Sequence, residues 1–174
     1  MNLIDLGDLI AYTDWERQQW HECLREHGDA VLQTSAGPHG DGRLSTVGEI
    51  VRHIFSAEKR YVDRLSGREL TDTASIPTDS VDRLFAFGDE SRSGLREFIS
   101  TFPPQKWDAL EDHKIMTSTL RATPRKFIVH VVMHEIRHWA QIATLLRLSG
   151  LKTDFHDFLF SPVFGGELIR GVER

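Results

Sequence analysis

Apolar side chains recur at steps of three and four residues in four long segments of the chain, and this periodicity predicts four α-helices. Apolar positions on one face of each segment provide a core that the helices can share. The expected helices run from Leu3 to about Leu32, from Thr46 to Ser66-Gly67, from Asp79 or Ser80 to about Phe102, and from Thr123-Pro124 to Ser149.

Cap and breaker residues support these boundaries. Thr46 is followed by Glu49, which is the spacing of a capping box, and Thr123 precedes a proline at the first helical position. Gln105 to Ala122 is expected to be irregular, with short extended pieces, and the Phe-rich tail from Leu151 to Arg174 to pack over one end of the bundle. Since no set of strands competes, we expect an all-α, antiparallel four-helix bundle that forms a single domain over residues 1–174.

The fourth predicted helix has a polar centre on its inward face. Three polar side chains buried in an apolar seam cost on the order of 1–3 kcal/mol each unless they have partners, so a partner is expected opposite them. The seam steps by four and three residues through Phe127, Val131, His134, His138, Gln141, Leu145 and Leu148.

A metal ion is one partner that would satisfy this polar centre. Imidazoles four residues apart on a helix can converge on one ion, so His134 and His138 form a candidate pair. His53 lies on the inward face of the second helix and is the candidate third ligand, although a lone inward histidine is more often a hydrogen-bonded core residue. His130, one turn before His134, is a reserve ligand or a group beside the site.

His134 to His138 also matches the His-Glu-x-x-His pattern of zinc metallopeptidases, in which the glutamate is a general base. The residues after His138 lack the extended form of that motif, and no strand pattern precedes the helix to hold a peptide. We therefore disfavour a protease. Glu135 remains a candidate general base, but we favour a solvated or second-shell carboxylate.

Composition narrows the classes of partner. The net charge is −5, so the chain lacks the broad basic field that binds nucleic acid. The single cysteine excludes an internal disulfide, and no apolar run is long enough to span a membrane. The first eight residues carry two aspartates and no basic residue, unlike a secretory signal, and we expect a cytoplasmic protein.

A second apolar stripe lies on the back of the fourth helix, which is therefore expected to be buried on two sides. The stripe meets either another helix of the same bundle or a second copy of the chain, and we favour a homodimer. It comprises Val129, Val132, Ile136, Ala143 and Leu146, with Trp139 nearby.

Together these motifs resemble the DinB/YfiT-like superfamily of four-helix metal-binding proteins, over nearly the whole chain. The fourth-helix motif is the most specific part of the match, and it departs from the common Arg-Gly before Gln141, where this chain has Trp139-Ala140. The matching residues are Tyr12 and Trp15, His53 with Glu58 and Tyr61, His130, His134, His138 and Gln141, and Gly150-Leu151 with Asp157-Phe158.

The resemblance implies that His53, His134 and His138 bind a divalent metal ion, commonly zinc or nickel. Characterised relatives include thiol-dependent transferases and an isomerase that uses a low-molecular-weight thiol, so the leading hypothesis is a metal-dependent, thiol-S-transferase-like enzyme acting on a small molecule. A second hypothesis is hydrolysis by a metal-bound hydroxide, with Glu135 or His130 relaying protons. The third is a non-catalytic, dimeric metal- or ligand-binding protein.

Overall fold

Four long helices make up most of the computed structural model, which describes residues 3–37, 44–153 and 156–165. A two-stranded antiparallel hairpin precedes the last helix, and short 3-10 helices occupy the connections. The elements are α1 (Leu6–His27), η1 (Asp29–Gln33), α2 (Val47–Leu65), η3 (Thr73–Ser75), α3 (Val81–Thr101), η4 (Pro104–Lys106), β1 (Glu111–Ile115), β2 (Ser118–Ala122), α4 (Pro124–Leu148) and η5 (Phe158–Phe160).

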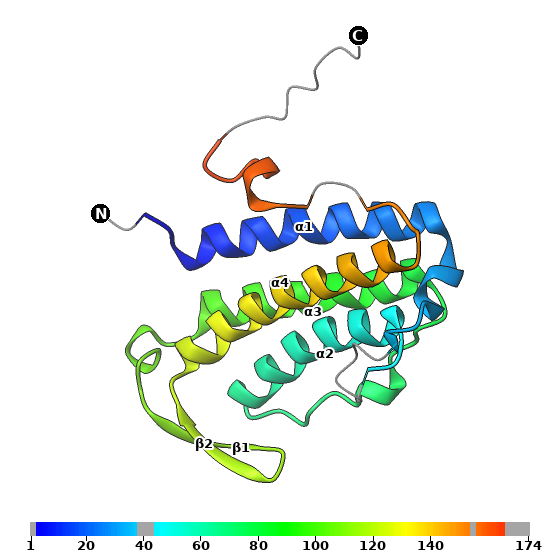
Figure 1. Ribbon diagram of the computed structural model, residues 1–174. Helices are drawn as coiled ribbons and strands as arrows, with labels where there is room; N and C mark the ends of the chain where they lie inside the picture. The colour runs from blue at the N-terminus through cyan, green and yellow to red at the C-terminus, as the bar shows by residue number, and fades with distance from the viewer. Residues whose placement is uncertain (1–2, 38–43, 154–155, 166–174) are drawn as a thin grey trace.

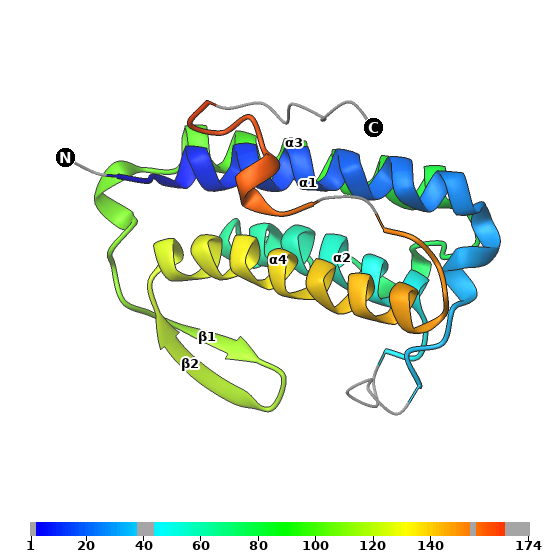
Figure 2. The same ribbon diagram turned by 45° about the horizontal axis from the view of Figure 1, so that its top comes forward.

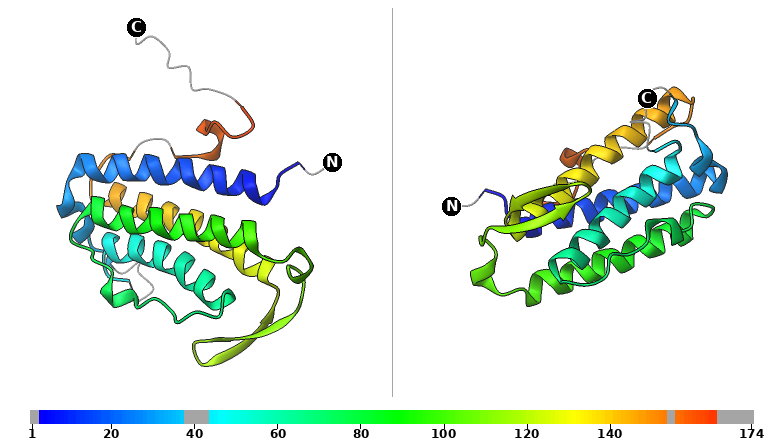
Figure 3. Two further views of the ribbon diagram at one scale, coloured as in Figure 1. Left: turned by 180° about the vertical axis from the view of Figure 1, so that it is seen from behind. Right: turned by 90° about the horizontal axis from the view of Figure 1, so that it is seen from below.

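The helices form a bundle of two layers, one of α1 and α3 and the other of α2 and α4 (Figures 1 and 2). This confirms the predicted four-helix bundle. The pairs α1–α3 and α2–α4 run antiparallel, whereas the consecutive helices α2 and α3 run in the same direction. The reason is that residues 66–80 return along α2 before α3 begins (Figure 3). At that end of the bundle, the Asp29 carboxylate, just beyond α1, accepts a hydrogen bond from the Val81 amide.

Two predicted segments differ from the structure. The first helix ends at His27 and not near Leu32, because Gly28 has a positive φ of 74° that terminates it. The described part of the tail, residues 151–153 and 156–165, lies along the side of α1 and not over an end of the bundle (Figure 2). The hydroxyl of Tyr12 donates to the His156 carbonyl at 3.0 Å, and its ring contacts Phe158 edge-on.

The connection before α4 is more regular than predicted. Glu111–Ile115 and Ser118–Ala122 pair in register from Glu111↔Ala122 to Ile115↔Ser118, and Met116 takes a positive φ of 51° in the turn. His113, which lies in the segment expected to be irregular, is buried in β1 because its ring packs against Phe127 of α4.

Most of the second apolar stripe of α4 is covered by the chain's own helices, since Val132, Ala143 and Leu146 are buried, whereas Val129 and Ile136 are half-buried. Trp139 is fully buried, stacks on Trp20 of α1 at a ring distance of 5.5 Å, and contacts Phe55 of α2. The stripe therefore meets other helices of the bundle, and it no longer argues for a homodimer, which stays a prediction without this support. None of the described helices is long and apolar enough to cross a bilayer.

Candidate metal centre

The histidine cluster is built by the two neighbouring antiparallel helices α2 and α4. Both begin at the predicted caps: the Thr46 side chain accepts from the Glu49 amide, and the Thr123 side chain accepts from the Lys126 amide. These caps fix where each helix starts and therefore which residues face the partner helix. His53 lies in the second turn of α2 and faces the middle of α4.

The structure brings the three predicted ligands together. The Nε2 atom of His134 lies 2.9 Å from Nε2 of His53 and 3.1 Å from Nε2 of His138. One ring nitrogen from each of the three residues lies within 4.8 Å of the others, so the cluster could hold a metal ion. For comparison, nitrogen ligands at 2.0–2.1 Å from one tetrahedral ion lie about 3.3 Å apart.

The hydrogen bonding of His138 orients it toward this centre. Its Nδ1 atom lies 2.9 Å from Oε1 of Gln141, and an amide oxygen only accepts, so Nδ1 carries the proton and Nε2 carries a lone pair. Nε2 of His134 lies within 3.1 Å of Nε2 of both other histidines, so three ring nitrogens meet at one point. A cation between the rings would be bound by all three lone pairs at once, and Gln141 would hold the ring of His138 in place. The residues present therefore fit a metal ion.

The electrostatics at His134 and at the neighbouring His130 favour a neutral imidazole, which is the form that binds metals. Burial, and after it the neighbouring rings of His138, His53 and His130 and the charge of Arg137, together lower the pKa of His134 to about 3. Burial, and then Arg137, also lower the pKa of His130.

The cluster opens into a pocket of about 990 Å³ between α2, α4 and the hairpin. His130 lies in its wall beside the cluster, with its ring centroid 5.4 Å from that of His134 and 5.5 Å from that of Tyr61. The buried His113 also lines the pocket, and its Nε2 atom has no hydrogen-bond partner among the residues described. A small molecule can therefore approach the three imidazoles from solvent.

Glu135 faces away from this pocket, into the core. Its carboxylate is 1% exposed and accepts hydrogen bonds from Nη2 of Arg17 at 2.9 Å, Nη2 of Arg92 at 2.7 Å and Nε1 of Trp139 at 3.1 Å. Burial alone would raise the pKa of Glu135, but the two guanidinium groups outweigh it and hold the pKa below its ordinary value. With both oxygens bound in this way, Glu135 is a buried counter-ion and is not placed as a general base; the expected solvated or second-shell position is not observed.

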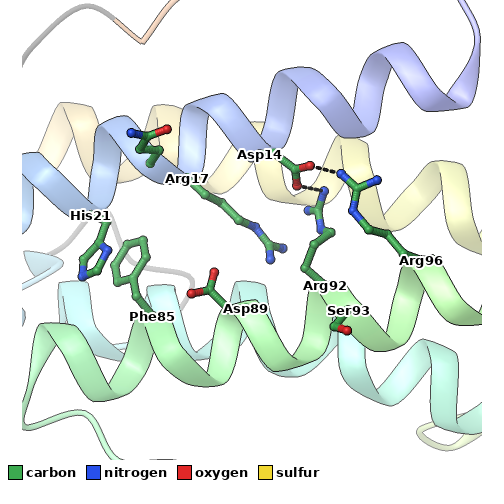
Figure 4. A pocket seen from close by; sticks show the side chains of 9 residues that line it. Asp14, Arg17, His21, Phe85, Asp89, Arg92, Ser93 and Arg96 are labelled. Carbon is green, nitrogen blue, oxygen red and sulfur yellow. Dashed lines mark hydrogen bonds and ion pairs between the residues drawn. The ribbon is translucent and has the colours of Figure 1, made fainter.

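The counter-ion belongs to a buried network that joins all four helices. Arg17 and Arg92 also bind the Glu58 carboxylate of α2 at 3.0 Å. Arg92 also donates to Asp14 of α1 at 2.9 Å (Figure 4). The sequence analysis missed these partners. A signal was present, since Arg17 is three residues before Trp20 and so lies on the inward face of its helix.

The fold and the site define a class of protein: a four-helix bundle in which two antiparallel helices carry three histidines that could hold a metal ion. The sequence matches the DinB family over residues 2–163, so the chain belongs to the DinB family, as its motifs predicted. Its structure is similar to the crystal structure of a DinB-like protein from Bacillus cereus ATCC 10987, with a TM-score of 0.61 and 16% sequence identity over 83% of this chain and 94% of that chain. At this identity the likeness shows the fold alone. A search of the curated proteins finds no match to this chain.

Trp139, at which the chain departs from the family motif, lies outside the pocket wall. Trp139, which replaces the common arginine of the motif, is fully buried and donates to Glu135. The indole is therefore part of the core, where it extends the buried network.

Proposed function

We propose that the protein is a metal-dependent enzyme of the thiol-S-transferase type, with His53, His134 and His138 as the ligands of a divalent ion, zinc or nickel. The observation that supports this most is the convergence of three imidazoles at the wall of an open pocket of about 990 Å³. Three protein ligands leave a position open for a substrate, as in catalytic sites of this kind.

A bound divalent ion would supply the positive charge that deprotonates a coordinated low-molecular-weight thiol. The chain's own residues then do two things. His130 in the pocket wall is neutral because its pKa is lowered, so it can accept the thiol proton. The pocket holds the electrophile beside the sulfur, so that a carbon–sulfur bond forms as the leaving group departs with its electron pair.

A second candidate function, hydrolysis, rests on the same position of His130, which could take a proton from water as readily as from a thiol. Glu135 has no part in either reaction, because both of its oxygens are bound by arginines in the core. The candidates differ in one requirement: hydrolysis proceeds without added thiol, whereas the transferase reaction needs it.

The metal proposal is tested first, by elemental analysis of protein purified with added Zn²⁺ or Ni²⁺. We expect one ion per chain in the wild type and in His130→Ala, and less than a tenth of that in His53→Ala, because loss of one of three imidazoles removes a third of the ligand set. Full stoichiometry in His53→Ala would refute the site.

The transferase proposal is tested with the loaded protein and 1-chloro-2,4-dinitrobenzene, with cysteine, glutathione and 2-mercaptoethanol supplied in turn. We expect thiol consumption above the uncatalysed rate with at least one of them, and its loss in His53→Ala. Consumption at the uncatalysed rate with all three, in protein shown to contain metal, would count against a transferase. Ester hydrolysis by the same sample would then favour the second candidate.

A further inference from the structure

The pocket beside the three histidines is strongly basic, although the whole chain carries a net charge of −5. Five cationic side chains line it, and they come from α2, the segment after α2, the hairpin and α4. Asp112 is the one carboxylate among the lining residues, and Arg121 binds both of its oxygens, at 2.7 and 2.8 Å. The cationic residues are Arg60, Arg64, Arg68, Lys114 and Arg137.

Most of this positive charge is not neutralised by acidic groups in residues 3–37, 44–153 and 156–165. Neither Arg137 nor Lys114 has an ion-pair partner in the part of the chain that the structure describes. Arg60 donates to the Thr71 carbonyl, and Arg64 packs over the ring of Tyr61 at 5.7 Å, so both keep their charge unpaired by a carboxylate.

Arg68 is the exception among the five, with Asp63 at 3.4 Å. Arg60 and Arg64 are also four residues apart on one helix face, where like charges repel. The remaining positive charges therefore face the pocket at a cost that an anion bound there would relieve.

The groove between α1 and α3 provides a comparison within the same molecule (Figure 4). It too is rich in arginine, since Arg17, Arg92 and Arg96 line it, but Asp14 and Asp89 line it as well. There the arginines are ion-paired within the chain: Arg96 and Arg92 bind Asp14, and Arg17 and Arg92 bind the buried glutamates. An arginine-rich surface in this protein is thus ordinarily matched by its own acids, and the pocket beside the histidines differs.

A further polar group in the pocket wall lacks a partner. His113 is 8% exposed, it lines the pocket, and no described residue is within hydrogen-bond reach of its Nε2 atom. A buried polar atom without a partner is costly, and such atoms in native structures commonly mark a place where a water, an ion or a ligand binds.

We propose that the pocket binds a small molecule that carries anionic oxygen groups, carboxylate or phosphate, and that Arg137, Lys114, Arg64 and Arg60 hold these groups while the reacting end of the molecule points to the three histidines. This inference rests on the proposed function for the reacting end, but the charge recognition itself requires only the pocket. On this proposal the site selects a thiol or substrate that carries several negative charges over a neutral one.

The test measures binding and needs no turnover. Protein loaded with Co²⁺ is titrated with mercaptosuccinate, which carries two carboxylates, and with neutral 2-mercaptoethanol, and the thiolate-to-cobalt absorption gives Kd. We expect mercaptosuccinate to bind at least about tenfold more tightly in 10 mM salt, and the preference to shrink in 0.5 M salt, where charges beyond about 4 Å are screened.

Charge reversal at two exposed positions identifies the residues responsible. In Arg137→Glu/Lys114→Glu we expect Kd for mercaptosuccinate to rise at least about tenfold and Kd for 2-mercaptoethanol to change less than about threefold. The control is Arg147→Glu, another exposed arginine of α4 that lies outside the pocket, which should leave both values within about twofold. Equal binding of the two thiols by the wild type, or an equal loss of both in the double variant, would overturn the proposal.

A thiol-free arm separates this proposal from the proposed function. If neither thiol changes the cobalt spectrum, the thiol-transferase proposal fails, and calorimetric titration with succinate and with inorganic phosphate then decides the anion proposal. Binding of either anion that is lost in the double variant and kept in Arg147→Glu supports it, and the stronger of the two identifies carboxylate or phosphate as the preferred group. No binding of either anion to the wild type overturns it.

Discussion

Replacing Glu135 by glutamine removes one negative charge from the buried network without changing the volume of the side chain. Glu135, Arg17 and Arg92 have side chains that are 1%, 6% and 7% exposed, so water cannot solvate the guanidinium groups left without this counter-ion. Breaking a buried ion pair by removing one partner costs about 3–5 kcal/mol, and at an m-value of roughly 2 kcal/mol per molar urea the midpoint should fall by about 1.5–2.5 M.

The assay is urea unfolding followed by circular dichroism, with metal content measured on the folded protein. We expect Glu135→Gln to be unstable but to bind metal at the wild-type stoichiometry, because the carboxylate is not part of the pocket wall. The opposite outcome, an unchanged urea midpoint with loss of metal or of activity, would refute the assignment of Glu135 to the core and restore its candidacy as a general base.

A second variant keeps the test decisive should Glu135→Gln fail to fold. Arg17→Met/Glu135→Gln removes one charge of each sign and leaves Arg92 paired with Glu58 at 3.0 Å. We expect the loss of unfolding free energy in the double variant to be smaller than the sum of the losses in the two single variants by about 1–3 kcal/mol. This difference is the coupling typical of residues that share one network. Additive effects would mean that the two groups do not compensate each other's charge.

Three further predictions concern packing, pH and metal. Gly88→Ala should destabilise the protein by about 1–3 kcal/mol in the same urea assay, because the added Cβ would lie 2.9 Å from the ring of Phe55. Gly94→Ala on the same helix is the control: its Cβ meets no atom within 4 Å, so it should stabilise the protein by about 0.5–1 kcal/mol. Equal effects of the two substitutions would contradict the close approach of α2 and α3. Burial raises the pKa of Glu16 above its ordinary 4.5, despite the hydrogen bond from His156. The free energy of unfolding should therefore fall as the pH rises from 4.5 through the raised pKa, and Glu16→Gln should flatten this slope when unfolding is measured from pH 4.5 to 8. An unaltered slope would assign the pH dependence to other groups. Free Zn²⁺ at 100 times its Kd should stabilise the folded state by about 2.7 kcal/mol. A chelator and the variant His53→Ala should each abolish this gain. A gain of the same size in His53→Ala would place the ion elsewhere.

Local signals predicted the helices and the position of the histidines well. Thr46 and Thr123 cap α2 and α4 as expected, and these caps set the faces on which His53 and His134 lie. The end of the first helix was missed because the apolar period continues through Val31 and Leu32, which are buried in η1 after Gly28 turns the chain.

The direction of α3 was beyond the reach of periodicity. An amphipathic pattern states which face of a helix is buried but not which way the helix runs, and a connection of residues 66–80 is long enough to reach either end of the bundle. The basic pocket was missed for a related reason. Its charges are contributed by segments far apart in the sequence, and each of Arg60, Lys114 and Arg137 alone is typical of a solvated surface.

The His-Glu-x-x-His pattern did not predict that Glu135 is buried, because a five-residue motif does not state how many faces of its helix are buried. Residues 134 and 138 lie about 40° apart around the helix axis, while residue 135 is about 100° from residue 134, so in a helix buried on two sides the three side chains meet different partners. The histidines face α2 and the open pocket, and Glu135 faces the arginines of α1 and α3. A rotation of α4 that carried His134 away from His53 would also pull Glu135 out of its ion pairs. The buried network therefore fixes the rotational setting of α4 at which the three imidazoles converge, and the arginines of the core help to build a site that they do not touch.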